Sequence, residues 1–175
     1  MGVLVDSDFK KLIKKGWIEI SDFSEERLNP NSYNLRLGKK LLVYKNDVLD
    51  MKVPNETEEI IIPEEGYVLQ PGELYLGETM ETTFGGDYIP LLEGRSSTGR
   101  LGINIHATAG WGDIGFRGKW TLEISVIKPV RIYAGVEICQ YVLETAEGQV
   151  EHSYHGKYQN QDGVIASRMN LDFNE

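Results

Sequence analysis

The chain has 175 residues and a mass of 19.8 kDa, which predicts one domain large enough to bury a hydrophobic core. Hydrophobic residues make up 41% and charged residues 26%, so a disordered or collagen-like chain is excluded. The formal net charge of −9 argues against nucleic acid as a partner, because duplex binding needs a cationic face. No apolar run approaches the roughly 20 residues that span a bilayer, and the first residues lack a signal-peptide core, so we expect a cytoplasmic protein with no membrane contact.

Metal-ligating residues are scarce in this chain. Cys139 is the single cysteine, which excludes an intrachain disulfide and every zinc site built on paired cysteines. The three histidines, His106, His152 and His155, do not have the HExxH spacing of a helical zinc site. We therefore expect no zinc, and no metal held by protein ligands.

The first predicted element is a short amphipathic helix between Ser7 and Gly16. Ser7 is the expected N-cap, and Phe9, Leu12 and Ile13 recur at helical spacing along one face. Gly16 stands where a helix commonly ends. This helix is expected to lay its apolar face against the rest of the fold.

A second short helix is expected in residues 24–30, ended by Pro30. Beyond it the helical period disappears, and short segments rich in β-branched and aromatic residues alternate with Gly, Pro and Asp. This pattern predicts an all-β fold (a sandwich, a jelly roll or a distorted β-barrel) behind short N-terminal helices. The expected strands lie within residues 32–38, 40–45, 58–63, 66–72, 73–83, 88–94, 102–109, 119–127, 130–135 and 137–144.

The last part of the chain is more polar than the rest. Residues 156–175 show only weak periodicity, so we expect a C-terminal arm or lid rather than a core element. The sequence is therefore divided into a β domain, residues 1–155, and this arm, residues 156–175.

The densest polar cluster lies between Glu93 and Gly102. Its guanidinium groups, hydroxyls and glycine-freed backbone amides make a candidate phosphate cradle in an otherwise acidic chain. The alternative is a polar β-turn with solvated arginines, and composition does not separate the two. A P-loop is rejected, because Arg100 and Leu101 follow the second glycine and no helix is expected there. The cradle residues are Arg95, Ser96, Ser97, Thr98, Gly99 and Arg100.

Two carboxylates follow the cradle. Asp113 lies in a glycine-dense turn, where backbone can approach a ligand closely. Glu123 lies in a strand-like run whose alternation puts Thr121 and Glu123 on one face and Leu122 on the other. If that face lines a pocket, Glu123 is a candidate acid/base. The alternative for Glu123 is an ordinary solvent-facing strand residue.

Several motifs along the chain resemble one known family. They are GRSSTGRLG, HATAGWGDIGFRGKWTLEI, EICQYVL and GKYQNQDGVIASR, together with NPNSYNLRLGK and LQPGELYLGETMET in the family's order. They cover most of the chain and resemble the dCTP deaminase branch of the dUTPase superfamily. The combination is specific, whereas GRSS alone is a weak signal.

The resemblance implies a dUTPase-like distorted β-barrel or jelly roll, a homotrimer with sites between subunits, and deamination of dCTP without zinc. By position, Glu123 is implied to be the acid/base, Asp113 to contact the deoxyribose 3′-hydroxyl, and Ser96 to orient water. Thr121 and Leu122 are implied to contact the base through their backbone. The other residues implied to bind the triphosphate or complete the site are Arg95, Ser97, Arg100, Gln140, Lys157 and Gln161.

The chain departs from the family pattern at three places. Gly112 stands where the family usually has Ile, and Asn34 replaces the usual Asp. Tyr154 matches the family's sugar-contacting Tyr but lies closer to Lys157 than usual. None of these positions belongs to the core constellation.

The resemblance leaves the reaction open. Gly110, where deamination-only relatives tend to carry His, favours a bifunctional enzyme, because glycine there leaves room beside the α-phosphate for a second water. The tail GKYQNQDGVIASR instead resembles deamination-only enzymes. The alternatives are dCTP deamination alone, onward hydrolysis of dUTP to dUMP, a dUTP diphosphatase only, and a catalytically silent nucleotide sensor. Mg²⁺ is expected to bridge the nucleotide phosphates, and dTTP is a candidate inhibitor.

Overall fold

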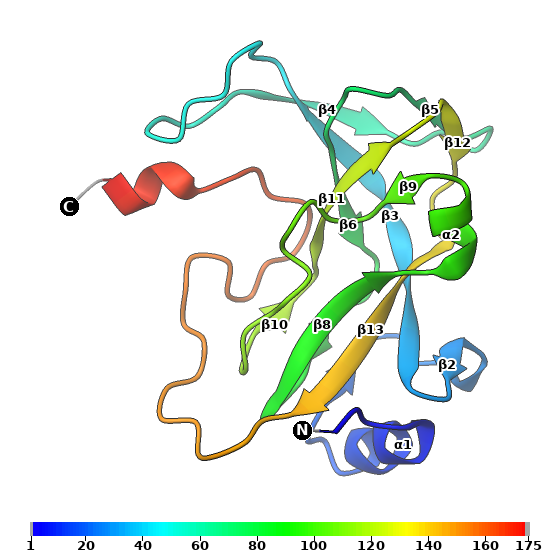
Figure 1. Cartoon of the computed structure of the whole chain (residues 1–175), viewed down its shortest axis with the longest axis vertical. Coiled ribbons are helices and arrows are strands. Elements are labelled where there is room, and N and C mark those ends of the chain that lie inside the picture. Colours follow the sequence, from blue (N-terminus) through cyan, green and yellow to red (C-terminus); the bar gives the residue numbers. More distant parts are fainter. Residues whose placement is uncertain (1, 174–175) are drawn as a thin grey trace.

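The computed structural model describes residues 2–173 of the chain. It is built mainly of strands, with short helices at its edges (Figure 1). Its elements in chain order are α1 (Asp6–Lys14), β1 (Glu19–Ile20), η1 (Glu25–Arg27), β2 (Leu28–Asn29), β3 (Ser32–Tyr44), β4 (Thr57–Ile61), β5 (Tyr67–Leu69), β6 (Tyr75–Thr79), β7 (Thr83–Phe84), β8 (Tyr88–Gly94), α2 (Ser96–Arg100), β9 (Ile103–Asn104), β10 (Arg117–Gly118), β11 (Thr121–Val126), β12 (Val130–Ile132), β13 (Glu137–Thr145) and η2 (Met169–Phe173).

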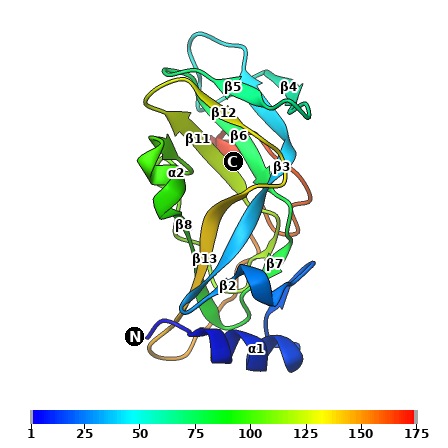
Figure 2. The same ribbon diagram turned by 90° about the vertical axis from the view of Figure 1, so that its right-hand side faces the viewer.

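The main sheet has eight strands, and its central order is β8-β13-β3-β6-β11-β9, with β2 and β4 pairing onto β3. All of these pairings are antiparallel. The sheet curls so that its two ends approach each other, and α2 connects the edge strand β8 to the edge strand β9 (Figure 2). The predicted distorted all-β barrel is therefore confirmed.

The inward faces of the strands form the core. Leu35, Leu37 and Leu41 of β3 are fully buried, and so are Leu122 and Ile124 of β11. Each buried aliphatic side chain of this kind stabilises a fold by roughly 1.5–3 kcal/mol relative to exposure. The alternate residues of β11, Thr121, Glu123 and Ser125, are half-buried, which confirms the predicted alternation along this strand.

Helix α1 packs the predicted apolar face on the barrel but begins earlier than expected. Phe9 and Leu12 are buried, and Gly16 follows the helix with φ +69°, a left-handed conformation that suits glycine. The N-cap is Val5, so the prediction of Ser7 as N-cap is wrong. The carboxylate of Asp8 accepts the Val5 N–H at 3.3 Å and takes over the capping role.

The second predicted helix is a single 3₁₀ turn, η1, and it ends at Arg27 rather than near Pro30. The chain then enters β2, because its backbone pairs with the start of β3. At the other end of the barrel, the residues of α2 were expected to form a turn without a helix. That expectation is wrong, since a five-residue helix follows β8 directly.

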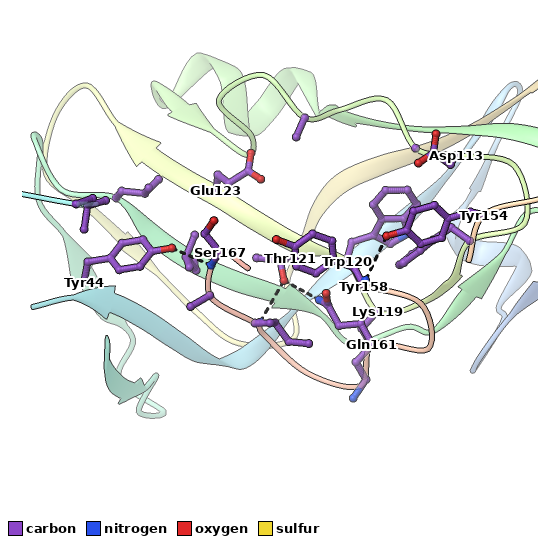
Figure 3. A pocket seen from close by; sticks show the side chains of 18 residues that line it. Tyr44, Asp113, Lys119, Trp120, Thr121, Glu123, Tyr154, Tyr158, Gln161 and Ser167 are labelled. Carbon is purple, nitrogen blue, oxygen red and sulfur yellow. Dashed lines mark hydrogen bonds between the residues drawn. The ribbon is translucent and has the colours of Figure 1, made fainter. Parts of the chain in front are cut away.

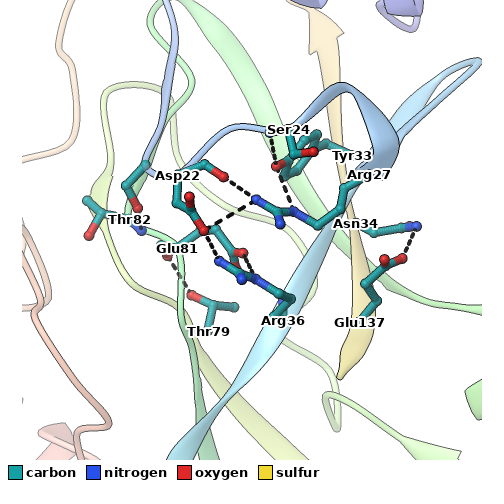
Figure 4. A network of polar contacts seen from close by, with 11 residues as sticks. Asp22, Ser24, Arg27, Tyr33, Asn34, Arg36, Thr79, Glu81, Thr82 and Glu137 are labelled. Atoms are coloured by element: carbon teal, nitrogen blue, oxygen red, sulfur yellow. Dashed lines mark hydrogen bonds and ion pairs between the residues drawn. The ribbon is translucent and has the colours of Figure 1, made fainter. Parts of the chain in front are cut away.

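A polar network holds the start of the chain to the barrel (Figure 4). Nε of Arg36 donates a hydrogen bond of 2.6 Å to Oε1 of Glu81, and the Arg36 backbone N–H donates one of 2.9 Å to Oε2. Asp22 pairs with the same guanidinium. The hydrogen bond to Glu81 is the largest cause that raises the pKa of Arg36. Because the Glu81 side chain is fully buried, it needs Arg36 to offset its lost hydration.

The chain beyond β13 runs back along the outside of the barrel (Figure 1). Between β13 and η2 this segment forms no strand or helix. Backbone hydrogen bonds hold it to the barrel. The Tyr154 N–H donates to the Ile114 carbonyl at 2.8 Å, and the Lys119 N–H donates to the Gln161 carbonyl at 2.8 Å. Within residues 2–173, no helix is long and apolar enough to cross a membrane.

Candidate active site

A cavity of about 480 Å³ lies between strand β11, the loop before β10 and the C-terminal arm (Figure 3). We call it the arm pocket. Aromatic and aliphatic side chains form much of its wall, and polar groups from three different parts of the chain project into it. It is lined by Tyr44, Leu49, Leu74, Leu76, Ala109, Gly112, Asp113, Phe116, Lys119, Trp120, Thr121, Glu123, Tyr154, Tyr158, Gln161, Ile165, Ala166 and Ser167.

Five of the residues singled out from the sequence meet in the arm pocket. Thr121 and Glu123 come from β11, Asp113 comes from the loop before β10, and Tyr154 and Gln161 come from the segment after β13. Their separation in sequence is large, so the barrel and the arm together create this arrangement. A concave site that holds a carboxylate beside aromatic walls suits a heterocyclic ligand.

Glu123 is positioned by strand and loop together. Its side chain is half-buried on the face of β11 that borders the pocket, so it is not a plain solvent-facing residue. Oε2 accepts a hydrogen bond of 3.1 Å from the backbone N–H of Ala107. A carboxylate fixed in this way can take a proton from a water molecule held in the pocket.

One edge of β11 is open beside Glu123. On one side, β6 pairs with β11 from Thr121 to Ile124, whereas β9 pairs on the other side only at Ser125 and Val126. Backbone groups near the start of β11 therefore have no strand partner on that edge among the described residues. The Leu122 side chain is fully buried in the core, so only its backbone can reach a ligand.

The arm closes the pocket through specific hydrogen bonds. Gln161 is only 7% exposed, and its Nε2 donates to Oγ1 of Thr121 at 2.6 Å (Figure 3). The backbone N–H of Ile165 donates to the same oxygen at 3.3 Å, and that of Ser167 donates to the Tyr44 hydroxyl at 3.0 Å. These bonds hold the arm over the side chains that line the pocket.

The loop that carries Asp113 is closely packed although Asp113 itself is exposed. A Cβ at Gly112 would lie 2.3 Å from Cη2 of Trp120, so only glycine fits at this departure from the family pattern. A Cβ at Gly110 would lie 2.8 Å from the Leu92 carbonyl oxygen and 2.6 Å from Nε2 of His106. A side chain at Gly110 would therefore collide with neighbouring protein atoms.

The predicted phosphate cradle lies on α2, on the opposite side of the barrel from the arm (Figure 1). Arg95 is half-buried, with Nη1 donating to the Glu137 carbonyl at 2.7 Å and Nη2 3.3 Å from Oε2 of Glu137. The Thr98 hydroxyl turns inward, where it accepts the Arg95 N–H at 3.1 Å. The exposed cradle residues are Ser96, Ser97, Gly99 and Arg100.

Two further predicted residues lie outside the arm pocket. Gln140 belongs with the cradle, because its Oε1 accepts from Ser32 Oγ at 2.7 Å and its Nε2 donates to the Gly94 carbonyl at 3.3 Å. Lys157 pairs with Asp172 of η2 at 2.7 Å. Within a single chain, the candidate acid/base therefore lies apart from the candidate phosphate ligands on α2.

Asn34 contacts the cradle indirectly, through Glu137, which pairs with Arg95. Nδ2 of Asn34 donates to Oε2 of Glu137 at 2.7 Å (Figure 4). Its Oδ1 accepts from Nδ2 of Asn29 at 2.8 Å. An amide satisfies both neighbours, whereas a carboxylate would face Glu137 without a proton to donate. This explains the departure from the usual Asp at position 34.

Sequence reasoning missed several members of the site. Tyr44 and Tyr158 line the arm pocket, and Glu137 holds Arg95. Glu137 is the first residue of a predicted strand, and nothing in the sequence indicates that it pairs with Arg95. Tyr44 lies in a predicted strand, where tyrosine is common and indicates no site. The hydrogen bond from the Ala107 N–H to Glu123 involves a backbone group, so no side-chain motif predicts it.

A solved structure shares this fold. The 2′-deoxycytidine 5′-triphosphate deaminase from Agrobacterium tumefaciens superposes with a TM-score of 0.66 at 24% identity. The match covers 83% of this chain and 48% of that chain, so this chain spans about half the length of that protein. This likeness supports the fold.

Sequence relatives are closer. A Clostridium botulinum protein named "dCTP deaminase, dUMP-forming" is 61% identical, covering 89% of this chain and 90% of its own length. A protein of the same name from Hathewaya histolytica is 54% identical, covering 98% of this chain and 99% of its own length. Residues 3–146 match the family described as dCTP deaminase-like, and the chain belongs to that family.

Proposed function

We propose that this protein deaminates dCTP and hydrolyses the product to dUMP, releasing ammonia and pyrophosphate. The observation that carries the proposal is Glu123, a carboxylate held by the Ala107 N–H at the wall of the arm pocket. The relatives named "dCTP deaminase, dUMP-forming" support both steps, because they align with nearly the whole chain. The dUMP formed in this way is the precursor that dTTP synthesis requires.

The first step adds water to the cytosine ring. Glu123 takes a proton from the water while the water oxygen bonds to C4, and Glu123 then delivers that proton to N3. Glu123 then moves the proton of the new C4 hydroxyl to the amino nitrogen, the C4–N4 bond breaks as the C4=O bond forms, and ammonia leaves. Ser96 and backbone carbonyls orient the water, and the open edge of β11 at Thr121 and Leu122 contacts the base.

The second step cleaves the triphosphate. Water attacks the α-phosphorus of dUTP, the bond to the bridging oxygen breaks, and pyrophosphate leaves with that oxygen. Asp113, at the mouth of the arm pocket, contacts the deoxyribose 3′-hydroxyl and helps to hold this water. Tyr154 packs against Phe116 beside it, and it forms the sugar wall of the site.

The triphosphate is bound by cations from several elements. Arg95, Arg100 and Lys157 contact its oxygens, together with Ser97, Gln140 and the backbone of Gly99. Three cationic side chains do not balance a triphosphate in a protein of net charge −9. We propose Mg²⁺ bound through the phosphates, where it supplies charge neutralisation. dTTP, which shares the triphosphate and the deoxyribose, is the proposed inhibitor.

A homotrimer joins the two halves of the site. In one chain, α2 and the arm lie on opposite sides of the barrel, so Glu123 and the exposed cradle residues need different chains to meet (Figure 1). A closed cyclic assembly places the α2 surface of one copy at the arm pocket of the next. The arm, residues 156–175, then acts as the lid that excludes water during turnover.

Product analysis tests the reaction. The protein is incubated with dCTP and Mg²⁺, and nucleotides, ammonia and pyrophosphate are quantified over time. We expect dUMP, ammonia and pyrophosphate with little free dUTP. Accumulation of dUTP without pyrophosphate would leave a simple deaminase. Cleavage of dUTP without ammonia from dCTP would leave a diphosphatase, and tight binding without turnover would leave a sensor.

Subunit mixing tests the shared site. The Glu123→Gln and Arg100→Ala variants are each expected to be inactive alone. Unfolding and refolding them together should restore roughly a quarter of wild-type activity, because each intact component comes from half of the chains in a cyclic assembly. A mixture that stays as inactive as its components would show that both residues act within one chain.

A further inference from the structure

Thr121 has a hydrogen-bonding role that its position on the base-facing edge does not explain. Its Oγ1 accepts Nε2 of Gln161 at 2.6 Å and the backbone N–H of Ile165 at 3.3 Å (Figure 3). Both donors belong to the arm, and they lie 40 and 44 positions after Thr121 in the chain. One hydroxyl on the barrel therefore binds two points of the arm.

The valence of the hydroxyl limits what else it can do. A threonine hydroxyl has two acceptor lone pairs and one O–H donor. The two arm donors occupy both lone pairs, so the remaining hydrogen can only be donated, and Thr121 lines the pocket. The closed arm thus turns this hydroxyl into a donor with no remaining acceptor capacity.

We propose that Thr121 is a positioning residue whose hydroxyl couples closure of the arm to binding of the nucleotide. When the arm is closed, the O–H is directed to an acceptor oxygen of the bound pyrimidine nucleotide, and the bound nucleotide in turn strengthens the arm contacts. Cytosine and uracil nucleotides both carry such oxygens, so the coupling serves both steps. The nucleotide part of this inference rests on the proposed function, whereas the arm part does not.

Other anchors of the arm do not replace this one. The Lys119 N–H binds the Gln161 carbonyl at 2.8 Å, and Lys119 Nζ pairs with the exposed carboxylate of Asp162 at 2.8 Å. Both fix the backbone close to position 161. Among the described residues 162–166, the backbone hydrogen bond from the arm to the barrel is the one from Ile165 to Thr121. The next one is the bond from Ser167 to Tyr44. The stretch that covers the pocket is thus held at Thr121.

The test removes the hydroxyl while keeping the shape. Thr121→Val is isosteric and suits a strand, and Thr121→Ser restores a hydroxyl at the same place. Ser125→Ala is the matched control, because Ser125 lies on the same face of β11 and accepts from Asn104 at 3.3 Å rather than from the arm. Thr121→Ala provides a second hydroxyl-free variant if the valine form does not fold.

Two measurements are made on each protein. Trypsin cleavage after Lys157 and Arg168 reports arm opening, with cleavage after Lys15 at the end of α1 as reference. Loss of two hydrogen bonds should speed the arm cleavages in Thr121→Val by about fivefold or more and raise the KM for dCTP by a similar factor. Thr121→Ser and Ser125→Ala should stay within about twofold of wild type on both measures.

The outcomes separate this inference from the proposed function. Arm cleavage in Thr121→Val at the wild-type rate would overturn the coupling, even if wild type converts dCTP. Equal cleavage of the serine and valine forms would overturn it as well, because the hydroxyl would then not be the cause. If wild type does not convert dCTP, the proposed function fails, while faster arm cleavage in the valine form would still support the anchor.

Discussion

The backbone N–H of Ala107 donates a hydrogen bond of 3.1 Å to Oε2 of Glu123, and this contact joins two parts of the site. Ala107 lies in the loop between β9 and β10 that also carries Asp113, whereas Glu123 lies on β11. The carboxylate proposed for proton transfer is therefore oriented by the same loop that carries the second carboxylate. A movement of this loop will therefore change the positions of both carboxylates, Asp113 and Glu123.

Replacing Glu123 by Gln tests the acid/base. Gln has nearly the same shape and still accepts from Ala107, but it cannot carry a proton. Ammonia release should fall by at least about 10²-fold while dCTP still binds. Ammonia is measured enzymatically and dCTP binding by calorimetry. Deamination at close to the wild-type rate would remove Glu123 from the mechanism.

Deleting residues 156–175 tests the arm. The main-sheet strands and their buried leucines lie before this point, so the barrel should keep its circular dichroism spectrum and unfold cooperatively. Turnover should collapse, because the pocket loses Tyr158, Gln161 and the residues that follow. The readouts are the spectrum, a thermal melt and the dCTP assay. A truncated protein with full activity would show that the arm is dispensable.

Asn34→Asp tests the support of the cradle. In this chain the new carboxylate would face Oε2 of Glu137, now 2.7 Å from Nδ2 of Asn34. Two ionised carboxylates repel, so the variant should be about 1–3 kcal/mol less stable at pH 7.5. The loss should shrink between about pH 6 and pH 4, because one carboxyl then takes up a proton and can donate to the other. Thermal melts across this range measure it.

The control for this variant is the double change Asn34→Asp with Glu137→Gln. The glutamine amide can donate to the new carboxylate, so most of the stability at pH 7.5 should return. A stability gap that does not change with pH, or a double variant less stable than either single one, would contradict the explanation from like charges.

Cys139 provides a test of burial. It is fully buried, and desolvation raises the pKa of its thiol, with Glu81 adding to the effect and Arg95 opposing it. A raised pKa leaves less thiolate at any given pH, so iodoacetamide should modify native Cys139 at least about 10²-fold more slowly at pH 8 than the unfolded chain. Mass spectrometry with and without denaturant measures this. Equal rates would mean that the core opens readily.

Local patterns predicted much of the barrel because burial imposes them directly. Strand β8 occupies the predicted residues 88–94, since turn residues bound it on both sides. Along β11, the alternation of buried Leu122 with half-buried Glu123 was visible as a period of two. The resemblance then added the roles of these residues, which alternation alone does not contain.

Tertiary contacts decide what the patterns did not predict. Helix α2 contains two serines, a threonine and a glycine, which are poor helix formers, and it is held by Arg95 on Glu137 and by Thr98 near the Ile138 carbonyl at 3.3 Å. The two-residue strands β1, β7 and β10 are too short to show a period. That the cradle and Glu123 lie apart follows from the path of β8 through α2 to β9, which no motif encodes.

We expect the residue at position 110 to influence whether the protein performs one reaction or two. The Gly110 carbonyl accepts the Leu92 N–H at 2.7 Å, and a Cβ there would lie 2.8 Å from the Leu92 carbonyl oxygen. A side chain at this position must therefore push the loop away from β8. Asp113 follows three positions later on the same loop, whereas Glu123 is held in β11 by its pairing with β6.

We expect Gly110→His to suppress pyrophosphate release by at least about tenfold and ammonia release by less, because small displacements of a positioned group cost large factors in rate. dUTP should then accumulate from dCTP. Gly110→Ala is the matched variant: it adds the same Cβ without the imidazole, so a similar bias towards dUTP would identify the displaced loop as the cause. Chromatography of both reactions measures the ratio of dUTP to dUMP. Equal loss of ammonia and pyrophosphate in the histidine variant would show that the loop serves both steps alike, because Ala107 on that loop also holds Glu123.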